Sequence, residues 1–149
     1  MTPEYADAQL AASDVGRRTL GGDVPAELPQ LRVRIAAQDI AAFVGATGSP
    51  WDHSHVPLTF PACWLALPPV RALITDSIGA GHLPVHEAQN FSYERELEVD
   101  REYILGVEAS QTDAPPRLTL RMSIANPEGE ICARLETVLR IVPISLEPH

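Results

Sequence analysis

Three side chains that can transfer protons lie close together in one short segment of the chain. Asp52, His53 and His55 fall within residues 48–59, where two prolines and a glycine indicate a loop. A histidine can act as a general base or orient a reacting carbonyl group, because its pKa lies near neutrality. His55 is therefore the first candidate for catalysis, and a loop histidine hydrogen-bonded to the backbone is the structural alternative.

The neighbours of His55 also allow two interpretations each. In an extended loop the side chain of His53 points away from that of His55, which makes His53 the second candidate. Asp52 either orients His55 or caps a turn of the loop. All three are ligand types that zinc accepts, but no further ligand cluster accompanies them. We therefore expect no metal and no other cofactor.

The segment that follows this loop, residues 60–75, is apolar around almost its whole circumference. Such a pattern predicts a helix buried on all sides. Thr59 is a plausible cap and Phe60 the first core residue, while the proline pair at 68–69 should kink or split the helix.

A helix that begins at Phe60 would expose unpaired backbone amides in its first turn. Pro61 has no amide hydrogen, so Ala62 or Cys63 would have to supply the donor. Preorganised amides of this kind stabilise the oxyanion that develops on a reacting carbonyl group. The two residues therefore form the predicted oxyanion site.

From residue 83 onward the apolar residues alternate with polar ones, which is the period of a half-buried strand. Four long strands are predicted, separated by short turn sequences: 83–97, 102–112, 116–126 and 131–144. Short links favour an antiparallel meander. With a strand or extended lead-in at 31–35 and a short helix at 37–46, the fold class is α+β.

Length and charge restrict the function further. The chain has 149 residues, enough for one domain, which we place at 29–149 after a flexible arm over 1–28. Its net charge of −9 argues against binding to nucleic acid or to an anionic membrane surface. The chain has no lysine, which excludes Schiff-base chemistry.

The start of the chain lacks the basic and apolar regions of a signal peptide, and no apolar run is long enough to span a membrane. We therefore expect a cytoplasmic protein. Cys63 and Cys132 are then expected to be reduced, buried and without a redox role.

The order of one buried helix and four long strands resembles the hot-dog superfamily. Three segments are similar to its MaoC-like hydratase and dehydratase branch: residues 39–48, the sequence VPLTFP at 56–61, and LPVHEAQNFSYEREL at 83–97. The resemblance implies a curled sheet around a central helix. It also implies an acyl thioester of coenzyme A or acyl carrier protein as substrate, and a homodimer or a heteromer with a second hot-dog chain.

Hydratases of that branch use the aspartate and histidine of a loop similar to G-D-x-N-P-I-H. Here Ser49 and Ser54 stand at those two positions, so only the location of the loop is carried over. Candidate substrate contacts follow from the resemblance and from the face of the first long strand: Thr59, Phe60, Trp64, His86 and Ser92. His86 is otherwise a packing or dimer-contact residue, and alternation predicts that Ser92 shares its face.

The expected function is conjugate addition of water or a small amine to a 2-enoyl thioester, hydrolysis of the thioester, or both. Some hot-dog enzymes of secondary metabolism carry out these variants. The alternative is a non-catalytic hot-dog subunit that only shapes the acyl tunnel of a catalytic partner. A small-ligand binding module would explain the fold but not the loop residues.

Overall fold

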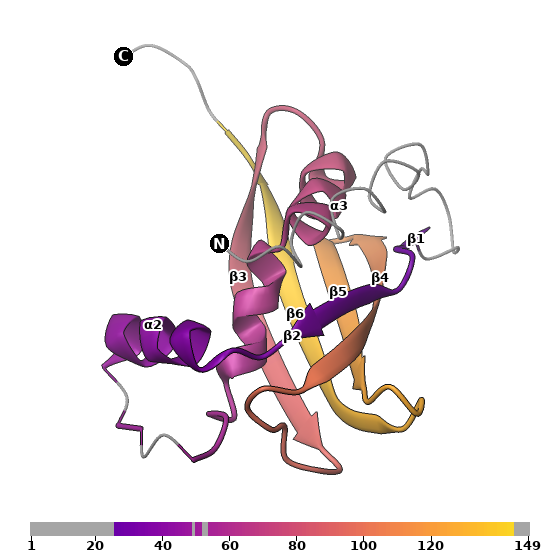
Figure 1. Cartoon of the computed structure of the whole chain (residues 1–149). Coiled ribbons are helices and arrows are strands. Elements are labelled where there is room, and N and C mark those ends of the chain that lie inside the picture. The colour runs from indigo at the N-terminus through magenta and orange to yellow at the C-terminus, as the bar shows by residue number, and fades with distance from the viewer. Residues whose placement is uncertain (1–25, 49, 52–53, 145–149) are drawn as a thin grey trace.

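The computed structural model describes residues 26–48, 50–51 and 54–144. Within them the helical segments over residues 60–78 lie against one face of a curved antiparallel sheet, and the helix over residues 37–47 projects to the side (Figure 1). In chain order the elements are β1 (Ala26–Glu27), β2 (Leu31–Arg34), α2 (Ala37–Thr47), η2 (Phe60–Ala66), α3 (Pro68–Ile78), β3 (His82–Tyr93), β4 (Glu102–Asp113), β5 (Pro116–Ala125) and β6 (Ile131–Pro143). The α+β class is confirmed.

The sheet runs in the order β1-β4-β5-β6-β3, and β2 also pairs with β4. Strands β4, β5 and β6 form the predicted meander. The prediction is wrong for β3, which pairs with β6 at the far side of the sheet. β1 and β2 occupy the edge of β4, so the chain has to carry β3 across to the other end.

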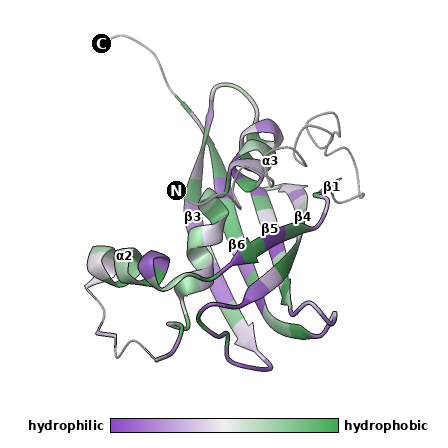
Figure 2. Cartoon of the chain, viewed as in Figure 1, coloured by the Kyte–Doolittle hydropathy of each residue, from purple (hydrophilic) through white to green (hydrophobic). Residues whose placement is uncertain are grey.

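Alternation along the strands sets the two faces of the sheet, as the hydropathy colouring shows (Figure 2). In β5 the apolar residues Leu118, Leu120, Met122 and Ile124 are all buried against the helical segments. This confirms the period-two pattern read from the sequence. We call this side the helix face and the opposite side the outer face.

A β-bulge at Glu87 changes which residues of β3 lie on each face. His86 pairs with Leu139 and Ala88 with Val138, so Glu87 is the extra residue. Residues that pair directly across antiparallel strands share a face. His86 therefore lies on the helix face, whereas Ala88 and the residues in step with it lie on the outer face.

The bulge overturns the prediction that Ser92 and His86 share a face. Ser92 pairs with Arg134 on the outer face, opposite to His86. Strict alternation would have joined the two, but an extra residue shifts the phase of every side chain beyond it.

The predicted split of the central helix is confirmed. A 3-10 segment, η2, ends at Ala66 and the α-helix α3 begins at Pro68, with Leu67 between them. Two features differ from the expectation. The Thr59 side chain makes no capping hydrogen bond, because its backbone is already in the helical region with φ −94° and ψ −2°.

The second difference concerns burial of this helical segment. In α3 only Pro69, Val70 and Leu73 are buried. The sheet covers one side of α3 and nothing else in the described chain covers the other, so burial on all sides is not observed.

The start of the described chain already belongs to the sheet. Ala26 and Leu28 are buried, and β1 pairs with β4. This segment falls within the predicted arm over 1–28, whose first 25 residues lie outside the described part. The predicted arm therefore stays a prediction for residues 1–25, whereas residues 26–28 pack with the domain. None of the helices in the described ranges is long and apolar enough to cross a membrane.

Candidate functional site

Two aromatic side chains hold the loop that precedes η2. The Trp51 indole Nε1–H donates a hydrogen bond to the backbone carbonyl of His55 at 2.5 Å. The Tyr93 hydroxyl at the end of β3 donates a short hydrogen bond to the carbonyl of Leu58. Burial raises the pKa of Tyr93 to about 12, so the hydroxyl keeps its proton and remains a donor at neutral pH. The Tyr93 hydrogen bond thereby ties the chain at Leu58 to the end of β3.

His55 lies between these two anchors. Its side chain is exposed, and the next residue, Val56, is buried in the core. The backbone at His55 is thus held while the imidazole remains accessible. Asp52 and His53 lie outside the described residues, so the proposed partnership of Asp52 with His55 stays a prediction.

The amides predicted to form an oxyanion site are engaged in the turn itself. The Ala62 amide donates to the Thr59 carbonyl at 3.1 Å. Cys63 is one residue further into the 3-10 helix, where amides bond three residues back. In the single chain these amides are not free donors, because the tighter helix uses them from its first turn.

Cys63 is not poised as a nucleophile. Burial, with a smaller contribution from the charge of Asp39, raises the pKa of its thiol to about 12. The thiolate is therefore scarce at neutral pH, which agrees with the expectation of an unreactive cysteine.

Phe60 and Trp64 belong to the core of the described chain. Phe60 packs edge-on against Phe43 of α2, with ring centroids 5.5 Å apart, and against Trp64 at 5.9 Å. Both Phe60 and Trp64 are almost fully buried, whereas Thr59 is exposed. The contact with Phe43 joins α2 to η2.

His86 is exposed on the helix face of β3. This strand is an edge strand: its only partner among the described strands is β6. Leu83 and Val85 are about half exposed on its outer face. His86 therefore lies beside an unpaired sheet edge, not inside the single chain.

The sequence interpretation missed Trp51 and Tyr93, which hold the loop. Both could have been found from their chemistry. A tryptophan or tyrosine side chain tends to bury its ring while its N–H or O–H group donates a hydrogen bond to a nearby acceptor. Within the described ranges no group of three or more histidine, cysteine or acidic side chains could hold a metal ion.

Comparison with known sequences gives no assignment. No family model matches the chain, and no curated protein matches it in sequence.

Solved structures do match over most of the chain. The HadBC complex of Mycobacterium tuberculosis, a 3R-hydroxyacyl-ACP dehydratase, aligns with a TM-score of 0.60 at 15% identity, over 78% of this chain and 95% of that one. The (R)-hydratase from A. caviae involved in PHA biosynthesis aligns with a TM-score of 0.54 at 20% identity, over 83% and 98%.

A hypothetical thioesterase with coenzyme A from Streptococcus pneumoniae TIGR4 aligns with a TM-score of 0.57 at 8% identity, over 94% of this chain and 95% of that one. At these identities the likeness establishes the architecture alone. Together with the helical segment lying on a curved sheet of order β1-β4-β5-β6-β3, it shows that the chain has the hot-dog fold.

Proposed function

We propose that the protein acts on acyl thioesters, with His55 as the general base or the group that orients the thioester. The supporting observation is the loop held by Trp51 and Tyr93, which presents an exposed imidazole directly before η2. Solved hot-dog proteins with hydratase, dehydratase and thioesterase names have the same architecture.

In conjugate addition, a neutral His55 takes a proton from water or a small amine as the nucleophile attacks the β-carbon of a 2-enoyl thioester. The electron pair moves to the thioester oxygen, and as the carbonyl re-forms the α-carbon takes the proton from His55, which completes the addition and restores the base. In hydrolysis, the same base takes a proton from a water that attacks the carbonyl carbon, and the tetrahedral intermediate then breaks its C–S bond and expels the thiolate, which takes that proton from His55. In both reactions negative charge develops on the carbonyl oxygen.

The amides of Ala62 and Cys63 remain the proposed donors to that oxygen. Because both amides already donate within the first turns of η2, each would have to share its hydrogen between a backbone carbonyl and the substrate oxygen when the substrate binds. Shared, three-centre hydrogen bonds are common at helix ends. Asp52 and His53 remain proposed as partners of His55.

A second chain at the edge of β3 is part of the proposal. An unpaired edge strand is a template for pairing with another chain, and Leu83 and Val85 add apolar area beside it. Such a partner would enclose a tunnel near His86, Thr59 and the η2 aromatic residues for an acyl chain carried on coenzyme A or acyl carrier protein. We further propose that the assembly is cytoplasmic.

The test is to incubate the purified protein with crotonyl and butyryl thioesters, with and without glycine, and to identify products by mass spectrometry. We expect product from the wild type and a large loss in His55→Ala. His82→Ala, which removes another exposed histidine, is the matched control and should remain active. A free acid from both thioesters identifies hydrolysis, and a mass increase only with crotonyl thioester identifies addition.

A non-catalytic subunit is the second candidate. It is favoured by Ser49 and Ser54 at the positions of the acid and base, and by the engaged amide of Ala62. In that case the chain alone yields no product, and activity appears only with a second hot-dog chain that carries the complete loop. The same result would refute the autonomous enzyme.

A further inference from the structure

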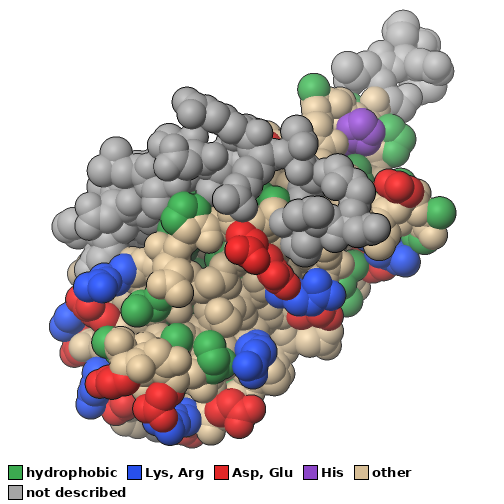
Figure 3. All heavy atoms as spheres, turned by 90° about the vertical axis from the view of Figure 1, so that its right-hand side faces the viewer, with side chains coloured by type: hydrophobic (Ala, Val, Ile, Leu, Met, Phe, Trp, Pro, Cys, Tyr) green, Lys and Arg blue, Asp and Glu red, His purple; other side chains and the backbone are tan. Residues whose placement is uncertain are grey.

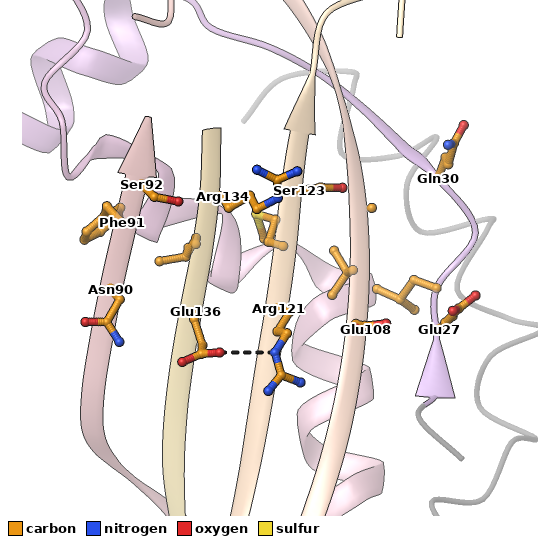
Figure 4. Close-up of a pocket in the computed structure, with 15 residues that line it drawn as sticks. Glu27, Gln30, Asn90, Phe91, Ser92, Glu108, Arg121, Ser123, Arg134 and Glu136 are labelled. Carbon is orange, nitrogen blue, oxygen red and sulfur yellow. Dashed lines mark hydrogen bonds and ion pairs between the residues drawn. The ribbon is translucent and has the colours of Figure 1, made fainter. Parts of the chain in front are cut away.

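The outer face of the sheet contains a hollow that the proposed reaction does not use. It has a volume of about 710 Å³, lies over strands β3, β6, β5 and β4, and reaches the β1–β2 segment at the edge of β4 (Figure 4). This volume is in the range of small-molecule sites. Viewed from the side of β4, acidic and basic side chains are interspersed over the described surface (Figure 3). Inside the hollow, by contrast, the basic side chain without an ion-pair partner lies apart from the acidic side chains without one.

One cross-strand row of the hollow is basic. Ser92 of β3, Arg134 of β6, Ser123 of β5 and Gly106 of β4 lie in register. Arg134 is exposed and makes no hydrogen bond or ion pair with any residue of the described ranges. Ser92 and Ser123 flank it on the two neighbouring strands (Figure 4). We call Arg134 with these two hydroxyls the basic pole.

Gly106 keeps this row open. A Cβ atom at Gly106 would lie 2.7 Å from the Ser123 hydroxyl oxygen. Because glycine carries no Cβ, that hydroxyl can occupy the space above the β4 backbone. A guanidinium fork with adjacent hydroxyl donors matches the geometry of a carboxylate.

The next cross-strand row, two residues further along the strands, is acidic where it reaches β4 and β1. Glu27 of β1 and Glu108 of β4 pair directly across the ladder, and neither has an ion-pair partner in the described part of the chain. Like charges directly opposite each other destabilise a sheet. We call this pair the acidic pole. Beside it Arg121 and Glu136 neutralise each other, with Nε and Oε2 3.1 Å apart.

We propose that the hollow binds a small zwitterion, with its carboxylate at the basic pole and its ammonium group at the acidic pole. A plain anion would leave Glu27 and Glu108 uncompensated, and a plain cation would leave Arg134 unused. Arg134 and Glu108 lie two residues apart along the strands and two strands apart across the sheet, which places their backbones about 12 Å from each other. An ω-amino acid or a dipeptide fits this spacing better than an α-amino acid does.

The test is calorimetric titration of the full chain, without any thioester, with 5-aminopentanoate, pentanoate and pentylamine. We expect the zwitterion to bind at least tenfold more tightly than either single-charge analogue, and more tightly than glycine. Equal affinity for pentanoate would overturn the proposal in favour of a simple anion site. No binding of any of the compounds would overturn it altogether. Neither outcome bears on the thioester assay.

Two variants test the contribution of each pole to binding separately. Arg134→Gln and Glu108→Gln should each weaken binding of 5-aminopentanoate at least tenfold. Arg71→Gln on α3 and Glu128→Gln in the β5–β6 turn make the same charge changes outside the hollow and should bind like the wild type. Wild-type affinity in either pole variant would refute the proposal.

A stability measurement distinguishes a built site from a surface coincidence. Without ligand, Glu108→Gln should raise the melting temperature, because it removes the repulsion with Glu27, while it weakens binding. A variant that loses both stability and binding would instead indicate that Glu108 has a structural role, and would contradict the acidic pole.

Discussion

The Thr137 hydroxyl offers a direct test of how the core is packed. Thr137 lies on the helix face of β6, is 1% exposed, and its Oγ1 has no hydrogen-bond partner among the described residues. It pairs across the sheet with Gln89 of β3 and Leu120 of β5. We predict that Thr137→Val stabilises the protein, because valine has nearly the same shape and no hydroxyl to leave unsatisfied.

The magnitude follows from the cost of an unpaired buried polar group. Leaving a buried donor or acceptor unsatisfied costs about 1–3 kcal/mol, and the added methyl group contributes a further ~0.8 kcal/mol when it is buried. After allowing for imperfect packing of the new methyl group, we expect a gain of about 1–2 kcal/mol. For a chain of this length that corresponds to roughly 2–8 °C in melting temperature.

The assay is urea and thermal denaturation of the wild type and the variant, followed by circular dichroism. Thr119→Val is the matched control, because Thr119 lies on the outer face of β5 and is only half-buried; it should change stability by less than about 0.5 kcal/mol. A loss of stability in Thr137→Val would refute the reasoning, since it would mean that the hydroxyl makes a hydrogen bond in solution.

Three further predictions concern the bulge, the core and the thiol. Although burial alone would raise the pKa of Glu87, its hydrogen bonds and ion pairs with Arg117 and Arg140 lower it overall. The stability advantage of the wild type over Glu87→Gln should therefore be complete at neutral pH and disappear as acid protonates Glu87, in melts between about pH 7 and pH 3. Phe60→Ala should cost about 3–5 kcal/mol in chemical denaturation, because the ring is 1% exposed, whereas truncation of the exposed Leu58 should have little effect. Cys63, with a thiol pKa of about 12, should resist iodoacetamide at pH 8 until the protein is unfolded, as mass spectrometry can show; rapid native labelling would contradict this.

The sequence predicts the strands well because each alternates cleanly. Predicted and observed bounds of the last three strands agree within one residue, for example 116–126 against Pro116–Ala125. The same holds for the split of the central helix, since a proline pair has a local effect on the backbone. These features depend on residues close together in the chain.

Two of the features that were missed depend on residues far apart in the sequence, and a third depends on the type of helix. The position of β3 beside β6 reflects competition with β1 and β2 for the edge of β4. The bulge at Glu87 depends on two arginines of other strands, with contacts of 2.6 Å and 3.0 Å. The engaged amide of Ala62 follows from η2 being a 3-10 helix rather than an α-helix, and composition alone does not separate the two.

The bulge also determines how β3 can meet another strand. If Glu87 took a regular place in the ladder instead of bulging, Leu83 and Val85 would be in phase with Phe91 and would point toward the helices; with the bulge, they point outward and are 52% and 48% exposed. The apolar side of the strand therefore changes face part way along its length. A neighbouring strand that slid along β3 by one residue would oppose apolar to charged side chains on at least one half. A single bulged residue thus sets the register in which a further strand can pair with the free edge of β3.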